Sequence, residues 1–187
     1  MNLTSQEKKQ LLSLAHFSIE SGFRPTHENP IPKDSSSTLA IKAGAFVTIT
    51  INNKLRGCIG YIQSDDELSK TVMDAAFQAA FHDPRFTPLS ESEFNNIQLE
   101  ISVLSPPFPL NSYDEIIIGE HGLILEESGR KALLLPQVPI EHKMDKEAFL
   151  SALCNKAGLY EDYWRETQLK IKGFTANVFS ENDEDLQ

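Results

Sequence analysis

Hydrophobic and polar residues alternate most clearly over residues 46–51, where β-branched and aromatic side chains are interleaved with threonines, as is typical of a half-buried strand. The next two residues, Asn52 and Asn53, tolerate the positive φ angles of a tight primed turn. A second predicted strand follows, with the sequence LRGCIG at residues 55–60. The pattern predicts a β-hairpin over residues 45–62, and we expect the rest of the fold to be organised around it.

Hydrophobic stripes at helical spacing predict three amphipathic helices. The first begins at a capping box formed by Thr4 and Glu7. The second carries an alanine-rich face that lets a helix lie close to a sheet, and it ends before Pro84. The third is closed by Gly158. The predicted helices span residues 4–22, 64–82 and 145–157.

The remaining periodic segments predict strands, and prolines at 106, 107 and 109 mark a junction between two lobes. The last predicted strand changes phase at Gly173, where we expect a bulge. Residues 23–38 have little periodicity and form either a loop that crosses the site or an ordinary connector. The predicted strands after the hairpin cover residues 97–103, 116–118, 122–125, 132–136 and 168–179.

The LRGCIG strand holds the strongest candidate chemistry. Because side chains on a strand alternate between faces, Arg56 and Cys58 are predicted to be same-face neighbours, and a guanidinium beside a thiol favours the thiolate. Gly57 and Gly60 weaken a strand unless a bulge, a close backbone approach or room for a ligand requires them. The alternative is that Cys58 is a small buried hydrophobic residue and the glycines relieve crowding.

Two further segments carry candidate side chains. The sequence HDPRFTPLS at residues 82–90 presents His82, Asp83 and Arg85 beside the second helix, either as part of a binding groove or as a local ion pair at a helix end. Glu100 lies on the polar side of the strand over residues 97–103. If a second layer covers that side, Glu100 needs a partner such as an arginine or a histidine; otherwise it faces water.

His121 lies between Gly119 and Gly122, a placement that presents an imidazole in a tight loop. Histidine is the side chain most easily poised for proton transfer near neutral pH, so His121 is a candidate general base. A histidine in a turn is also commonly inert, and this alternative stays open.

Composition limits the function classes. The chain has 187 residues and is 40% hydrophobic, which suits one domain. Of its formal net charge of −10, four acidic residues in the stretch 181–187 supply −4, so −6 remains on the body. We therefore expect neither nucleic acid nor an anionic membrane as a partner, and we expect an acidic disordered tail. No apolar run is long enough for a membrane span and the first residues do not resemble a signal peptide, so we expect a cytoplasmic protein.

Metal binding and disulfide formation are not predicted. The two cysteines, Cys58 and Cys154, have no metal-type spacing, and the five histidines are scattered. We expect no metal and no cofactor.

Six segments together resemble the AMMECR domain family, whose prokaryotic members are called AmmeMemoRadiSam system protein A. They are LRGCIG at 55–60, AAFHDPRFTPL at 79–89, LEISVLSPP at 99–107, IGEHGLIL at 118–125, LLLPQV at 133–138 and FLSALCNKAGL at 149–159. The resemblance implies a single AMMECR domain over residues 1–180. It implies an α+β, two-lobed fold of antiparallel sheets flanked by helices, with a groove between the lobes near LRGCIG. The acidic tail over 181–187 lies outside it.

The resemblance also suggests partners, since prokaryotic members tend to be encoded with a Memo-like protein and a radical SAM protein. Two functions follow as hypotheses. In the first, the protein binds a small molecule or a companion protein in the groove lined by LRGCIG, and bulk at Gly57 or Gly60 abolishes binding. In the second, it is an enzyme with Cys58 as nucleophile, His121 or His82 as base, and Glu100 orienting the base.

Overall fold

The protein is described by a computed structural model that covers residues 3–24, 37–127, 129–183 and 186. The chain divides into two compact units, unit 1 (Met1–Leu104 and Asn177–Gln187) and unit 2 (Ser105–Ala176). Unit 2 is inserted between two strands of unit 1. Its two connecting segments are tied together, because the Ser105 amide donates to the Thr175 carbonyl and the Thr175 amide donates to the Ser105 hydroxyl, both at 2.9 Å.

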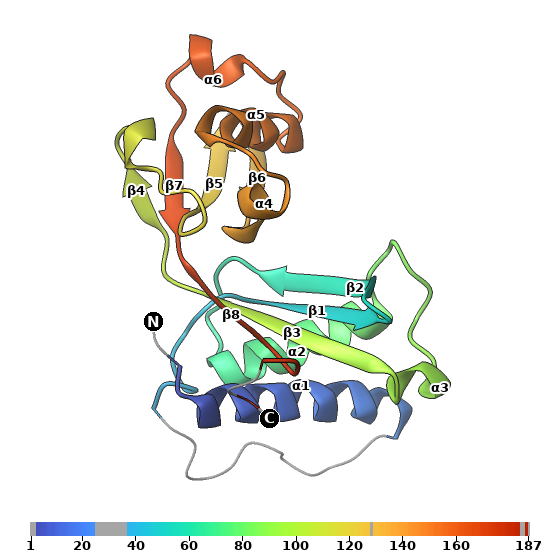
Figure 1. The fold of residues 1–187 in the computed structure, drawn as a ribbon. Coiled ribbons are helices and arrows are strands. Elements are labelled where there is room, and N and C mark those ends of the chain that lie inside the picture. The colour runs from blue at the N-terminus through green and yellow to red at the C-terminus, as the bar shows by residue number, and fades with distance from the viewer. Residues whose placement is uncertain (1–2, 25–36, 128, 184–185, 187) are drawn as a thin grey trace. The chain divides into compact units, whose positions relative to one another are not determined.

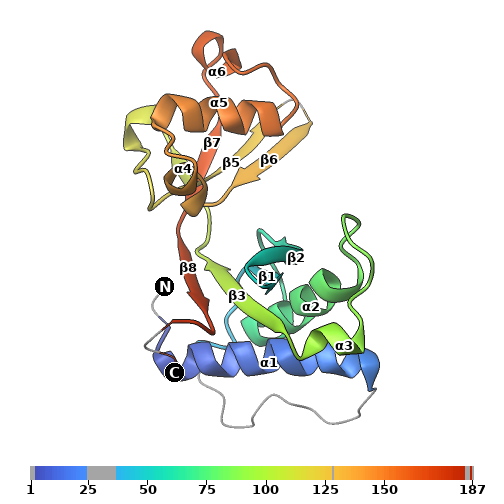
Figure 2. The same cartoon turned by 45° about the vertical axis from the view of Figure 1, so that its right-hand side comes forward.

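Unit 1 is a four-stranded sheet with the strand order β2-β1-β3-β8. Helices α1 and α2 lie on one face of this sheet, as Figures 1 and 2 show. We refer to the face that neither α1 nor α2 covers as the open face. The elements are α1 (Ser5–Phe23), β1 (Ala45–Ile51), β2 (Lys54–Tyr61), α2 (Leu68–Phe81), α3 (Glu91–Phe94), β3 (Ile97–Leu104) and β8 (Ala176–Ser180).

The hairpin pattern produces the core of unit 1. Ala45, Val47 and Ile49 of β1 are fully buried, and they pack in one cluster with the small-residue face of α2. Asn52 and Asn53 have φ angles of 52° and 60°, so the predicted turn with two positive φ angles is confirmed. The capping box at the start of α1 is also confirmed.

Unit 2 is a second four-stranded sheet, with the order β4-β7-β5-β6, that packs against α5. Phe149, Leu150, Leu153 and Cys154 of α5 are buried in its core, as their helical spacing predicts. Its elements are β4 (Phe108–Leu110), η1 (Tyr113–Glu115), β5 (Gly122–Glu127), β6 (Arg130–Leu134), α4 (Gln137–Glu141), α5 (Lys146–Lys156), α6 (Tyr163–Glu166) and β7 (Ile171–Phe174).

Three predicted elements differ from the structure. Residues 116–118 form no strand and instead follow the short helix η1 into a turn. The segment 168–179 is not one bulged strand: it breaks at Thr175 into β7 and β8, which belong to different sheets. The second helix begins at Leu68 and not at Ser64. Most of the predicted loop over residues 23–38 lies outside the described residues.

The predicted acidic tail over 181–187 begins with a residue that has structural partners. The Glu181 carboxylate lies 2.5 Å from His16 Nε2 and accepts the Leu99 amide at 2.9 Å. Residues 184, 185 and 187 lie outside the described residues. In the part of the chain that the structure covers, no helix has the length and apolar character needed to cross a membrane.

Candidate functional site

Three polar side chains form a row across the open face. In the strand register, Thr48 of β1 pairs with Cys58 of β2 on one side and with Glu100 of β3 on the other. Direct partners on antiparallel strands project to the same face. All three residues are half-buried, and the Thr48 hydroxyl donates to the Cys58 sulfur at 3.3 Å. This open-face row therefore places a thiol, a hydroxyl and a carboxylate side by side.

We expected Arg56 to lie beside Cys58 on the same face, but its guanidinium bonds elsewhere. The register of β1 and β2 shifts between Ile49 and Thr50, and this bulge leaves Arg56 without a partner residue. Its guanidinium is taken up by two interactions with Glu93, at 2.8 and 3.1 Å. The strict alternation that predicted Arg56 beside Cys58 fails because the bulge inserts one extra residue.

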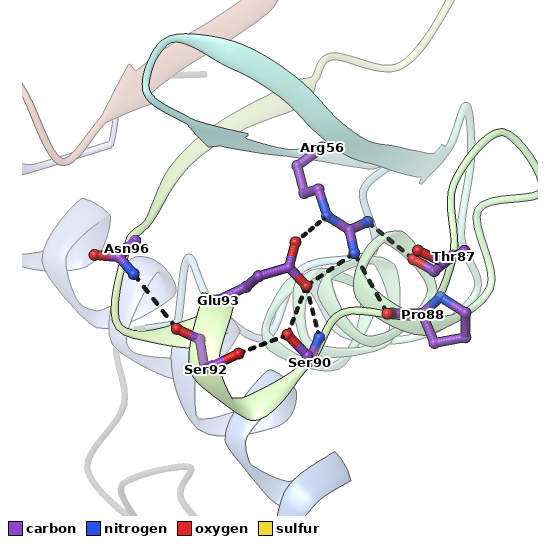
Figure 3. A network of polar contacts seen from close by, with 7 residues as sticks. All are labelled: Arg56, Thr87, Pro88, Ser90, Ser92, Glu93 and Asn96. Carbon is purple, nitrogen blue, oxygen red and sulfur yellow. Dashed lines mark hydrogen bonds and ion pairs between the residues drawn. The ribbon is translucent and has the colours of Figure 1, made fainter.

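Arg56 instead bonds to the loop that follows α2, at residues 87 and 88. It donates to the carbonyls of Thr87 and Pro88 at 2.9 and 3.3 Å, as Figure 3 shows together with the Glu93 pair. The Arg56 side chain is only 14% exposed. Glu93 also accepts bonds from the amide and hydroxyl of Ser90 in a capping box for α3. The Arg56 guanidinium, followed by Ser90, lowers the pKa of Glu93 to about 2.

The same loop holds the main chain of Cys58. Among the described strands β2 is at the edge of its sheet, so none of them pairs with the outer side of Cys58, where its amide and carbonyl lie. The amide donates to the Asp83 carboxylate at 2.8 Å, and Arg85 Nη2 donates to the Cys58 carbonyl at 3.1 Å. These two side chains, which we call the edge clasp, satisfy the main-chain groups that a further strand would otherwise bond.

Within the edge clasp, Arg85 donates two hydrogen bonds to the Asp83 carboxylate, from Nε at 2.9 Å and from Nη2 at 2.7 Å. The Asp83 side chain is 2% exposed. Its bonds from the Arg85 side chain, and then from the amides of Cys58 and Arg85, outweigh burial and hold the pKa of the carboxyl well below its ordinary range. Asp83 is therefore a buried carboxylate with every bond it needs to stay ionised.

The cation beside Cys58 is thus Arg85 and not Arg56. The pKa of Arg85 is raised. The hydrogen bond to Asp83 is the largest cause, and Cys58 makes a smaller contribution. Sequence reasoning listed Arg85 as a groove residue but did not pair it with Cys58. It missed Thr48 and Glu93, although the spacing Ser90-x-x-Glu93 is itself a capping-box signal.

The two glycines of the motif are explained by packing. A Cβ at Gly57 would lie 2.1 Å from the Ala79 carbonyl oxygen of α2. A Cβ at Gly60 would lie 2.4 Å from the Ala45 carbonyl oxygen and from the Phe46 ring. Both glycines let backbones approach closely, so bulk at either position changes the fold before it changes a binding surface.

The candidate histidines lie elsewhere. His82 is exposed at the end of α2, with its ring 5.8 Å from that of Phe77. His121 belongs to unit 2, where it is 9% exposed, and its Nδ1 accepts the Ile117 amide at 3.3 Å. In unit 1 the structure brings the predicted residues Asp83 and Arg85 to Cys58, and Glu100 lies two strands away in the same row. Across the described ranges, no three His, Cys, Asp or Glu side chains converge to hold a metal ion.

The fold and site define a class of protein: an α+β chain of two antiparallel sheets with helices, in which an edge clasp holds the main chain of a cysteine on the edge strand β2. The AMMECR1 family model matches residues 12–179, and the chain belongs to this family.

Relatives that are 37–42% identical cover 81–96% of this chain. The chain is 42% identical to protein NEQ441 of Nanoarchaeum equitans, over 81% of this chain and 88% of that protein. It is 37% identical to a Methanothermobacter thermautotrophicus protein, over 96% and 97% of the two chains. The crystal structure of the uncharacterized protein PH0010 from Pyrococcus horikoshii is similar, with a TM-score of 0.84, 38% identity and coverage of 93% and 91%.

Proposed function

We propose that this AMMECR-domain protein binds a small molecule or a segment of a companion protein on the open face around Cys58. We further propose that it acts in a pathway with Memo-like and radical SAM proteins, and that it is cytoplasmic. In this role the protein presents its ligand to a partner and performs no reaction of its own.

The observation that supports a binding site is how LRGCIG is held. Arg56 is bonded to α3 and the loop after α2, Gly57 lies against α2, and the main chain of Cys58 is bonded by the edge clasp. These contacts leave the Cys58 side chain on a rigid platform beside Thr48 and Glu100. Rigid placement lowers the entropy that a ligand must lose on binding, which is the physical advantage of a preformed site.

The test compares variants of the open face in complex formation with the purified Memo-like protein from the same genome, measured by calorimetry. Cys58→Ser keeps the size of the side chain and is expected to bind with an unchanged Kd. Thr48→Tyr fills the middle of the row and is expected to weaken binding at least tenfold. Lys70→Ala, on the exposed side of α2, is the control. A folded Cys58→Ser protein that no longer binds contradicts this proposal.

One observation favours the second candidate, a cysteine-dependent enzyme. The Thr48 hydroxyl donates to the Cys58 sulfur and Arg85 donates to the Cys58 carbonyl, so a hydroxyl and a guanidinium lie beside the candidate nucleophile. The pH dependence of Cys58 alkylation tests this. Cys154 is the internal control, because it is fully buried and burial raises the pKa of its thiol. Rapid labelling of Cys58 at a pH well below about 8.5 supports the enzyme, and labelling only on unfolding contradicts it.

A further inference from the structure

The guanidinium of Arg85 is fixed in one orientation. Nε and Nη2 are bonded to the two Asp83 oxygens, and Nη2 also donates to the Cys58 carbonyl. The ring of Phe86 lies 5.5 Å from the guanidinium carbon, within range of a cation–π contact. Bonds along one edge of the planar fork and an aromatic ring near it hold Arg85 without using its whole donor capacity.

The Arg85 side chain is more than half exposed, although its guanidinium is held on the protein side. Nε and Nη2 of Arg85 bond to Asp83 and to the Cys58 carbonyl, the guanidinium also interacts with the Cys58 side chain, and the Arg85 side chain is 54% exposed. Arg56 differs in this respect: its Nε and both Nη atoms donate to protein oxygens, and it is 14% exposed. Of the two arginines around LRGCIG, Arg85 is therefore the one that a ligand can reach.

The charge of Arg85 is only partly cancelled by Asp83. The Asp83 carboxylate accepts the amides of Cys58 and Arg85 as well as Nε and Nη2 of Arg85, which spread its negative charge over four donors. An arginine held edge-on by a buried carboxylate keeps its planar fork ordered, so a ligand anion meets donors that are already in place.

We propose that Arg85 recognises an anionic group, a carboxylate or a phosphate, on the ligand that binds at the open face. This inference rests on the proposed function, because it names the chemical class of the ligand of that same site. The anion lies at the edge of the sheet next to Cys58, and the rest of the ligand extends over the open-face row.

Two alkylating reagents that differ in charge test the inference on the full-length protein. Iodoacetate and iodoacetamide both form a sulfur–carbon bond with the Cys58 thiolate and release iodide, but only iodoacetate carries a carboxylate. The measured quantity is the ratio of the two alkylation rates at Cys58. A guanidinium within a few ångströms is expected to raise this ratio about fivefold in the wild type relative to Arg85→Gln, and added salt is expected to reduce the difference.

Two variants serve as controls. Arg24→Gln removes the same charge from an exposed arginine at the C-terminal cap of α1 and is expected to leave the ratio unchanged. Arg85→Lys keeps the charge but loses the fork, and it is expected to retain part of the preference for iodoacetate. The iodoacetamide rate and the absence of Cys154 labelling report whether each variant is folded.

The outcomes separate this inference from the function on which it rests. If iodoacetamide labels Cys58 and the ratio is the same in the wild type and in Arg85→Gln, the anion inference is wrong while the open face stays accessible. If neither reagent reaches Cys58 in the folded protein, the proposed site itself is wrong. If the ratio does depend on Arg85, a further experiment identifies the anion. Inorganic phosphate and succinate are each tested for protection of wild-type Cys58 from iodoacetamide, and the anion that protects better is the one that Arg85 prefers.

Discussion

Gly57 is the residue of LRGCIG whose missing side chain has the clearest structural cause. An alanine at this position would place its Cβ 2.1 Å from the carbonyl oxygen of Ala79, which is main chain and cannot rotate away. We expect Gly57→Ala to lower the free energy of unfolding by about 3 kcal/mol, because β2 must move away from α2. Urea denaturation measures this loss.

The control on the same strand is Leu55→Ala. Leu55 is 45% exposed, so its truncation is expected to change stability by about 0.5 kcal/mol or less. Equal stability of the wild type and Gly57→Ala would mean that β2 and α2 are not in close contact at this point, and room for a ligand would again explain the glycine.

At the scale of elements, Arg56 and Glu93 join β2 to α3. The folded-state pKa of Glu93, about 2, lies below the unfolded value of about 4.3, so this pair stabilises the protein fully above that unfolded value. Its contribution is lost as the pH falls from about 4 through 2. The carboxyl of Asp83, whose pKa is also lowered, adds a loss of the same sign in acid.

We therefore expect Glu93→Gln to cost about 1–2 kcal/mol at pH 7 and less at pH 3, where the wild type has itself lost part of the pair. Urea midpoints of both proteins at pH 7, 5 and 3 measure the difference. Parallel pH curves for the two proteins would contradict an ionised Glu93 that is stabilised by Arg56.

At the scale of the whole molecule, each unit has its own hydrophobic core. Phe149 is fully buried in unit 2, and Phe149→Ala is expected to cost about 3–5 kcal/mol. Because the two cores are separate clusters, we expect hydrogen exchange to accelerate in α5 and β5 while α2 keeps its protection. Val72→Ala in α2 is the reciprocal control, and equal loss of protection in both units would show that they unfold as one.

Local patterns predicted much of this fold. The alternation in β1, the Asn52-Asn53 turn and the capping box of Thr4 and Glu7 depend on residues within a few positions of one another. The segment before β8 was predicted less well. We interpreted the change of phase at Gly173 as a bulge in one strand, but the chain leaves one sheet at Thr175 and enters another, and periodicity carries no signal for that change.

The candidate site was also predicted only in part from local patterns. By itself the sequence determined the family, the central hairpin and the segments 55–60 and 82–90 that carry the site residues, because motifs and periodicity are properties of neighbouring residues. Only the tertiary structure decided that Arg56 reaches Glu93, 37 positions away, and that Asp83 and Arg85 hold Cys58, 25 and 27 positions away. A one-residue bulge redirected Arg56, and no local pattern records which distant loop closes the open edge of a strand.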